Sequence, residues 1–352
     1  MVASSFVLRC KQVAVLARGA SLGIALGAAL ACLPPAASAA KVETDPARLV
    51  TAAVKEGSLS ILSANHVEDE QALVTGFNKK YPGIKVQVSR GVNMQILPKI
   101  EAGAQKGSID ADIVSLTERS AALRMSKYYA DYTPPNAADF DALSGKNEKA
   151  WSRFVFAPSI AYNDQLVTNP PKDWMEMLDP KYAGKIGVVT IGSGGTSWTL
   201  AQYQRIKVNP DYWSKLAALK PVVYASGAQL GSALISGEVL IGYSYQSVLG
   251  AQIAQGAPVK LLYPKSGVPG TPEASAILLT AKHPNAAKLY MDYALSKEGQ
   301  EIVVKLGHFS LLKSVQAAHQ ADRPVLWFAS AEENARRDQW IKEWSDIFGV
   351  GK

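Results

Sequence analysis

The chain has 352 residues, of which 48% are hydrophobic and 19% charged, a composition typical of a globular protein whose length suggests about two domains. Its net charge of +7 includes Arg9, Lys11 and Arg18 near the N-terminus, so residues from 40 onward carry a net charge of 7 − 3 = +4. No basic cluster is interleaved with aromatic residues, and this argues against nucleic-acid binding. Both cysteines, Cys10 and Cys32, precede residue 40, which excludes a disulfide or a thiol nucleophile in the remainder.

Residues 1–39 have the order of a secretory signal peptide. Basic residues are followed by the apolar run 21–33 and by the small residues Ala37-Ser38-Ala39. The apolar run is too short for a membrane span, so we predict cleavage after Ala39 and export to the periplasm. Lipid attachment at Cys32 is the alternative, although Ala29-Leu30-Ala31 is a poor lead-in to it.

The next part of the chain alternates helix and strand patterns, which predicts a parallel sheet. The expected elements are a helix over 46–56, a strand over 59–62, the polar loop 63–66 followed by a helix, a strand over 84–88, a helix around 96–100, and a buried strand over 111–116 that ends at the polar residues 117–120. In open α/β sheets, ligands bind at the carboxyl ends of the strands, and the polar loops 63–66 and 117–120 lie there.

A second α/β pattern lies between two long strand-like runs, 154–163 and 274–281. It consists of a strand over 186–191, a glycine-rich turn over 192–197, a helix over 198–205, and strands over 222–224 and 239–243. Helices follow, and the last carries Trp340, Trp344 and Phe348 at steps of four. This order predicts two lobes, crossed twice by the chain near 155–162 and 274–279, with a cleft between them.

Several stretches resemble a known family in its order along the chain. They are "FNKKYPGIKVQVSRG" (77–91), "AYNDQLV" (161–167), "NPPKDWMEMLDPKYAGKIGVV" (169–189), "SGEVLIGYSYQSVLGAQIAQGAPVKLLYP" (236–264) and "HPNAAKLYMDYALSKEGQEIV" (283–303). The sequence is similar to the periplasmic solute-binding proteins of ABC importers (bacterial extracellular solute-binding proteins, family 1), in the ferric-ion, phosphonate and thiamine-like branch.

The resemblance implies a periplasmic-binding-protein type II-like fold, with two α/β lobes that close on one small ligand and present it to a membrane permease. The expected division is lobe one over 40–155 and 275–310, lobe two over 160–270, and C-terminal helices over 311–352 packed on the lobes. We expect a monomer with no cofactor and no bound nucleic acid.

The resemblance also places ligand contacts on loops from both lobes. The expected contacts are Ser63, Asn65, His66, Ser115, Thr117, Ser193, Gly194, Gly195, Thr196, Ser197, Tyr243, Tyr245, Gln246 and Glu273. The turn 193–197 precedes a helix, and the free N–H groups at a helix start attract anions, although Thr196 or Ser197 could simply cap that helix. His66 could donate to an anion or ligate a metal. Trp198, next to the turn, is a further candidate for ligand contact.

The ligand itself stays open at this stage: an organic anion, a phosphonate, a phosphate ester, a carboxylate, ferric iron or a cationic vitamin. Ferric iron prefers phenolate and carboxylate oxygens, and the iron-binding relatives carry two adjacent tyrosines here. In this sequence Ser244 separates Tyr243 from Tyr245, and residues two apart share a face only in an extended segment. A ferric site at His66, Tyr243 and Tyr245 is therefore the alternative to an anion site.

A secreted hydrolase on a similar fold is the competing functional class. A nucleophilic serine needs a histidine base oriented by a carboxylate, and a metallohydrolase needs a metal-binding motif. Neither a "GxSxG" elbow nor an "HExxH" helix occurs in the sequence. The sequence therefore predicts a binding protein rather than an enzyme.

Overall fold

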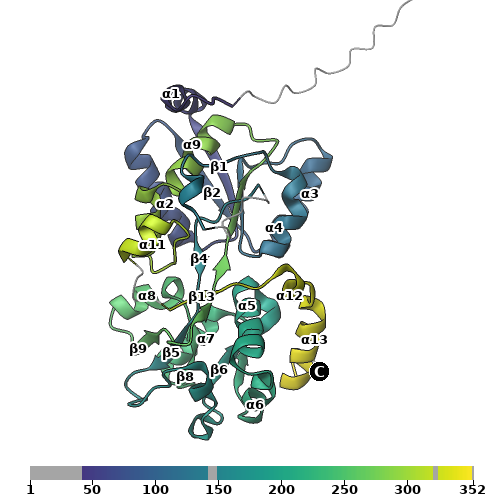
Figure 1. Cartoon of the computed structure of the whole chain (residues 1–352), viewed down its shortest axis with the longest axis vertical. Helices are drawn as coiled ribbons and strands as arrows, with labels where there is room; N and C mark the ends of the chain where they lie inside the picture. The colour runs from purple at the N-terminus through teal and green to yellow at the C-terminus, as the bar shows by residue number, and fades with distance from the viewer. Residues whose placement is uncertain (1–41, 142–148, 320–323, 351–352) are drawn as a thin grey trace, which may run out of the picture. The chain divides into compact units, whose positions relative to one another are not determined.

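The computed structural model describes residues 42–141, 149–319 and 324–350 (Figure 1). The predicted signal segment 1–39 lies outside the described residues. No helix in the described part is long and apolar enough to cross a membrane.

The helices and strands follow the predicted alternation. The α-helices are α1 (Pro46–Glu56), α2 (Val67–Lys80), α3 (Asn93–Gln105), α4 (Arg119–Met125), α5 (Gly195–Tyr203), α6 (Tyr212–Ala218), α7 (Gly227–Ser236), α8 (Gln246–Ala254), α9 (Pro284–Ala294), α10 (Lys297–Lys305), α11 (Lys313–His319), α12 (Ala331–Ala335) and α13 (Arg337–Phe348). The strands are β1 (Ser58–Ser63), β2 (Lys85–Arg90), β3 (Ile113–Leu116), β4 (Val155–Phe156), β5 (Ser159–Asn163), β6 (Gly187–Val189), β7 (Val222–Tyr224), β8 (Ile241–Ser244), β9 (Val259–Leu262), β10 (Val268–Pro269), β11 (Thr271–Pro272), β12 (Ala274–Ile277) and β13 (Leu326–Trp327).

The first lobe is built on a four-stranded sheet in the order β12-β3-β1-β2. Strand β1 is parallel to both β2 and β3, and β12 is antiparallel to β3. Helix α1 packs on α9 and helix α2 on α10. Leu59, Ile61 and Phe77 are buried in the core between sheet and helices. Because β1 and β3 run in the same direction, the segments that follow them meet at one edge of the sheet.

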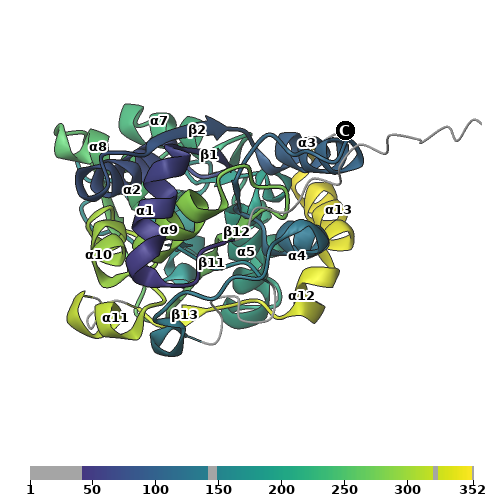
Figure 2. The ribbon, with the colours of Figure 1, turned by 90° about the horizontal axis from the view of Figure 1, so that it is seen from above.

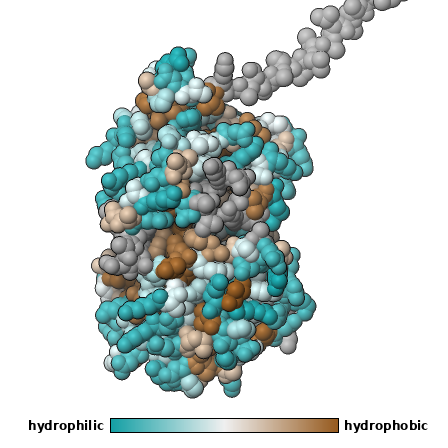
Figure 3. Space-filling model, in the orientation of Figure 1, coloured by the Kyte–Doolittle hydropathy of each residue, from teal (hydrophilic) through white to brown (hydrophobic). Residues whose placement is uncertain are grey.

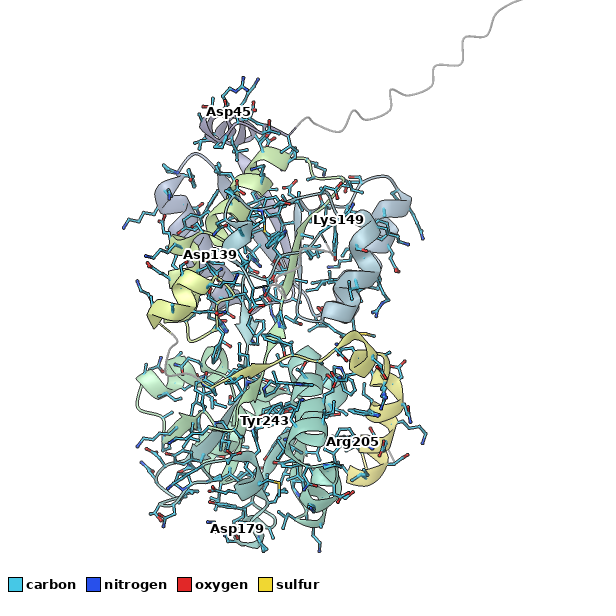
Figure 4. The ribbon with its side chains drawn as sticks, in the orientation of Figure 1. Asp45, Asp139, Lys149, Asp179, Arg205 and Tyr243 are labelled. Carbon is cyan, nitrogen blue, oxygen red and sulfur yellow. The ribbon has the colours of Figure 1, made fainter. Side chains whose placement is uncertain are left out.

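Asp45 caps the start of α1, the first helix of this lobe (Figure 4). Its carboxylate accepts a hydrogen bond from the Ala47 N–H at 2.9 Å. We expect Asp45→Ala to lower the free energy of unfolding by about 1 kcal/mol, because an N–H at the helix start loses its partner. Asp45→Asn is the matched control, since asparagine caps equally well. Equal losses for both variants in urea denaturation would show that the charge, and not the cap, stabilises the helix.

The second lobe contains the sheets β8-β5-β9 and β6-β7. Strand β5 is antiparallel to both of its neighbours, whereas β6 and β7 are parallel. An isolated bridge between Ile186 and Ile241 links the two sheets. Trp174, Tyr212 and Trp213 are buried in this lobe.

Three strand predictions need correction. The run 154–163 is not one strand, because Pro158, which has no N–H for a sheet hydrogen bond, separates β4 from β5. The run 274–281 ends as a strand at Ile277. The run 186–191 is a strand only over Gly187–Val189 and then turns into a short 3-10 helix, so helix α5 begins earlier than predicted, at Gly195.

The chain connects the lobes at β4–β5 and β11–β12, and β4 pairs with β11 in an antiparallel register. The C-terminal segment makes a third connection, which the sequence analysis missed. Helix α11 contacts α10 in the first lobe, β13 pairs with β10, and α13 packs on α6 in the second lobe. In Figure 1 this segment, drawn in yellow, passes from β13 through α12 to α13. On the face shown in Figure 3, hydrophilic residues cover most of the surface of both lobes.

Candidate ligand cleft

A fully buried arginine organises the first-lobe side of the cleft. Arg153 precedes β4, and its guanidinium binds both carboxylate oxygens of Glu70, with Nη2–Oε1 at 2.7 Å and Nη1–Oε2 at 2.9 Å. Its Nε lies 3.2 Å from Oε1 of Glu273 and 2.8 Å from Oγ of Ser275. Two carboxylates and one guanidinium are thus removed from water together, which is favourable only because each is hydrogen-bonded.

Four of the predicted ligand contacts belong to this network. Ser63 Oγ donates to Glu70 at 2.7 Å, and Asn65 Nδ2 donates to Glu70 at 2.9 Å. Ser115 Oγ accepts from Arg153 Nη2 at 2.7 Å, and Glu273 pairs with the same guanidinium. These side chains already have protein partners, except for the buried Asn65 Oδ1, which has none.

The two carboxylates of the network have opposite pKa shifts. Burial opposes ionisation of Glu70, but Arg153 and the hydrogen bonds from Ser63 and Asn65 hold its pKa below the usual value. Burial raises the pKa of Glu273, although Arg153 acts against that shift. Arg153 therefore supports the ionised form of Glu70 most strongly, because Glu70 receives the bidentate contact.

The remaining first-lobe candidates lie at the edge of this network. His66 is the N-cap of α2, is half-buried, and packs edge-on against Phe156 with ring centroids 6.4 Å apart. Burial lowers the pKa of His66, which favours the neutral imidazole. Thr117 is held by Asn93, whose Nδ2 donates to the Thr117 hydroxyl at 3.1 Å and whose Oδ1 accepts from the Thr117 N–H at 3.3 Å.

On the second-lobe side, the glycine-rich turn ends at the start of α5. Gly194 is the N-cap, and no side chain caps this helix. Ser197 Oγ donates to the Gly194 carbonyl at 3.0 Å and lies 3.1 Å from Ser193 Oγ, so the two serines hold the turn rather than cap the helix. The capping role that the sequence left open for Thr196 or Ser197 is therefore not found.

Strand β8 brings two tyrosines to the same region, and Figure 4 labels one of them, Tyr243, in the second lobe. Tyr245 is extended, so it shares a face with Tyr243, and their ring centroids lie 6.5 Å apart. Burial raises the pKa of both phenols well above the usual value, while a hydrogen bond with Thr196 opposes the shift at Tyr245. The Tyr245 hydroxyl is buried beside Thr196, and because a hydroxyl can both donate and accept, it keeps a hydrogen-bonding position for a ligand. The buried hydroxyl of Ser244 also lacks a partner.

The lobes are in direct contact at two glycines. A Cβ added to Gly195 in the second lobe would overlap the carbonyl oxygen of Thr117 in the first lobe. A Cβ added to Gly307 in the first lobe would overlap the side chain of Gln246 in the second lobe, so Gln246 lies across the cleft. A cavity of about 40 Å³, lined by Glu118, Gly195, Trp198, Thr199, Gly270, Thr271, Ala329 and Asn334, remains beside the first contact. The structure thus represents a closed arrangement.

The sequence pattern did not reveal Arg153, because the strand-like run was expected over 154–163 and Arg153 lies just before it. Arg153 lies between Trp151 and Phe154, in a mainly apolar stretch beside the hinge. An arginine in such a stretch requires buried acidic partners, so its position in the sequence was the signal that could have indicated a buried ion pair.

The comparisons with known proteins identify the family. A model of the bacterial extracellular solute-binding proteins matches residues 72–329. The chain belongs to that family. The solute-binding function expected from the sequence is confirmed at the level of this family. The type II-like periplasmic-binding-protein fold is also confirmed.

Two curated relatives differ in how much of the chain they cover. An uncharacterized protein of Haemophilus influenzae is 32% identical over 141 residues, which are 39% of this chain and only 41% of that protein. An Fe(3+)-binding periplasmic protein of Serratia marcescens is 24% identical over 286 residues, which are 76% of this chain and 82% of that protein.

Solved structures share the fold at low sequence identity. The substrate-binding protein of an ABC transporter from Agrobacterium tumefaciens superposes with a TM-score of 0.70 at 18% identity, covering 83% of this chain and 94% of the other. The periplasmic binding protein AfuA from Actinobacillus pleuropneumoniae, with fructose-6-phosphate bound, gives a TM-score of 0.64 at 20% identity, covering 84% of this chain and 99% of the other.

Proposed function

We propose that this solute-binding protein captures a small anionic organic or oxyanion-bearing solute in the periplasm and delivers it, as a monomer, to a membrane permease. The signal-like order of residues 1–39 and the extracellular family support export. Mass spectrometry of the exported protein tests the predicted start at Ala40. The lobe boundaries given above are part of the same proposal.

The observation that carries the ligand class is a buried hydroxyl beside the start of a helix that has no side-chain cap. Helices α5 and α8 have the N-caps Gly194 and Tyr245, and neither has a side-chain cap. The first N–H groups of a helix have no partner within it and carry a partial positive charge. The buried Tyr245 hydroxyl lies next to Thr196 in the first turn of α5, and Tyr245 is itself the N-cap residue of α8. A hydroxyl beside the free N–H groups of a helix start favours an oxyanion.

Charge supports the same class. The segments 192–198 and 243–248 contain no charged residue, so the second-lobe side offers hydroxyl and amide groups only. A ligand held here receives its hydrogen bonds from neutral donors, as buried anions in low-dielectric sites do when no counter-ion is present. AfuA, which shares the fold, was solved with the phosphate ester fructose-6-phosphate, which supports testing phosphate esters first.

Tyr245→Phe tests this arrangement because it removes only the hydroxyl. We expect the affinity for the bound anion to fall about tenfold, since a hydrogen bond to a charged group contributes about 1.5 kcal/mol or more. A thermal-shift panel of inorganic phosphate, fructose-6-phosphate, an aminoalkylphosphonate, citrate, ferric iron and thiamine identifies the ligand first. Calorimetry on the variant then measures the loss.

The matched control is Tyr224→Phe, which removes a phenol hydroxyl that binds Glu238 at the surface. It should leave the affinity unchanged. An unchanged affinity in Tyr245→Phe as well would contradict the proposed contact.

Ferric iron is the second candidate, since Tyr243 and Tyr245 share one face and a relative from Serratia marcescens is an Fe(3+)-binding protein. Both phenols are held in the protonated form, so binding iron would have to release their protons. Tight, coloured binding of iron accompanied by proton release in unbuffered titration would replace the anion proposal. Turnover of any of these solutes into a product would instead favour the enzyme class.

A further inference from the structure

The C-terminal helix reaches across to the first lobe. Arg337 is the first residue of α13, and its Nε lies 3.4 Å from Oε1 of Glu118, the N-cap of α4. The two side chains are only 26% and 16% exposed. Figure 2, which views the molecule from above, shows α4 and α13 on the same side of the molecule. An ion pair that is shielded to this degree is stronger than one on an open surface.

Helix α13 itself is fixed to the second lobe. Trp340 packs edge-on against Trp198 and Trp213, with ring centroids 5.9 Å and 5.7 Å away. Arg205 Nη1 forms an ion pair with Glu343 at 2.7 Å, which ties the helical turn after α5 to α13. The arginine at the start of α13 therefore moves with the second lobe when the lobes separate.

Glu118, in contrast, moves with the first lobe. It follows Thr117, whose carbonyl lies against Gly195 at the start of α5, and the Cα of Glu118 would lie 3.5 Å from a Cβ on Gly195. The pair with Arg337 thus joins the lobes beside the contact between Thr117 and Gly195. It can form only while that contact is closed.

We propose that Arg337 is a positioning residue of the ligand cleft: its ion pair with Glu118 holds the Thr117 loop against the start of α5 and keeps the lobes closed. The inference rests on the proposed function, because closure has a role only if the cleft retains a solute. The C-terminal segment, which the family's two crossings do not require, then has a role in setting how long the cleft stays shut.

The test measures closure directly and needs no ligand. Residues 40–352 contain no cysteine, so Gln105→Cys on α3 and Ser214→Cys on α6, both exposed, accept spin labels at single positions. Distances from double electron–electron resonance on the mature chain then give the closed fraction. We expect Arg337→Gln and Glu118→Gln each to lower the ratio of closed to open molecules about three- to tenfold, in the range of a partly buried ion pair.

The charge-swapped double variant Arg337→Glu/Glu118→Arg distinguishes the ion pair from general damage, because it should restore closure. Arg336→Gln is the matched control, since Arg336 pairs with the exposed Glu332 in α12 and should change nothing. The proposal is overturned if the wild type shows no closed population, if the single variants match the wild type, or if the swap fails to restore closure. Failure of every solute to bind would instead refute the proposed function while leaving the distances unchanged.

Discussion

Replacing Arg153 by methionine is expected to lower the free energy of unfolding by about 3–5 kcal/mol, the cost of leaving buried charges without their partner. Both Glu70 and Glu273 contact the guanidinium, and all three side chains are at most 1% exposed. Urea denaturation followed by tryptophan fluorescence measures the loss. Arg336→Met, at an exposed arginine, is the control and should cost well under about 1 kcal/mol.

The loss in Arg153→Met should depend on pH in a defined direction. Without the guanidinium, burial raises the pKa of both carboxyls in the folded state above the unfolded value of 4.5. The folded variant then binds more protons than the unfolded chain, so its stability falls as pH rises through this range and recovers toward pH 4. Adding Glu70→Gln and Glu273→Gln should recover much of the loss at pH 7. A loss that is the same at pH 4 and pH 7 would show that packing, and not charge, is the cause.

The fold could be predicted from the sequence because its signals are local. The strand 59–62, the helix after it and the strand 84–88 are marked by alternation and by Gly57 and Gly83 within about thirty residues. Gly57 ends α1 in the left-handed conformation, with φ of 66°, where glycine is favoured. Such patterns can be recognised without knowledge of distant contacts. The resemblance of the ordered motifs to the family then predicted the two-lobed arrangement.

The first-lobe site could not be predicted in the same way, because its side chains are committed by distant residues. Arg153 meets Glu70 across 83 residues and Glu273 across 120 residues of the chain. Ser63 and Ser115 look like ligand-binding hydroxyls at strand ends until these partners are known. No local pattern distinguishes a hydroxyl that faces a ligand from one that supports a buried ion pair.

The arrangement of the second-lobe candidates was more predictable because it depends on backbone geometry. A glycine-rich turn before a helix indicates free N–H groups, and an extended segment places Tyr243 and Tyr245 on one face. The sequence missed the C-terminal connection, since β13 has only the two residues Leu326 and Trp327 and carries no periodic signal. Arg337 was missed with it.

Gly195→Ala is expected to weaken solute binding about ten- to a hundredfold while leaving the protein as stable as the wild type or slightly more stable. The added methyl group fits the backbone of a helix start, and alanine favours the helix by up to about 1 kcal/mol. In the closed form, however, it would overlap the Thr117 carbonyl, and overpacking costs about 1–3 kcal/mol. The methyl group meets the first lobe only on closure, so it penalises the closed form and not the fold.

Gly194→Ala is the matched control, since a Cβ there meets nothing within 4 Å. Calorimetry gives the affinities, and thermal unfolding without solute gives the stabilities. A lower affinity together with an unchanged or higher stability in Gly195→Ala would show that the methyl group disfavours closure of the lobes and not folding. Equal affinities for Gly195→Ala and Gly194→Ala would contradict the closed contact, because a methyl group that costs nothing cannot lie against the Thr117 carbonyl in the solute-bound form.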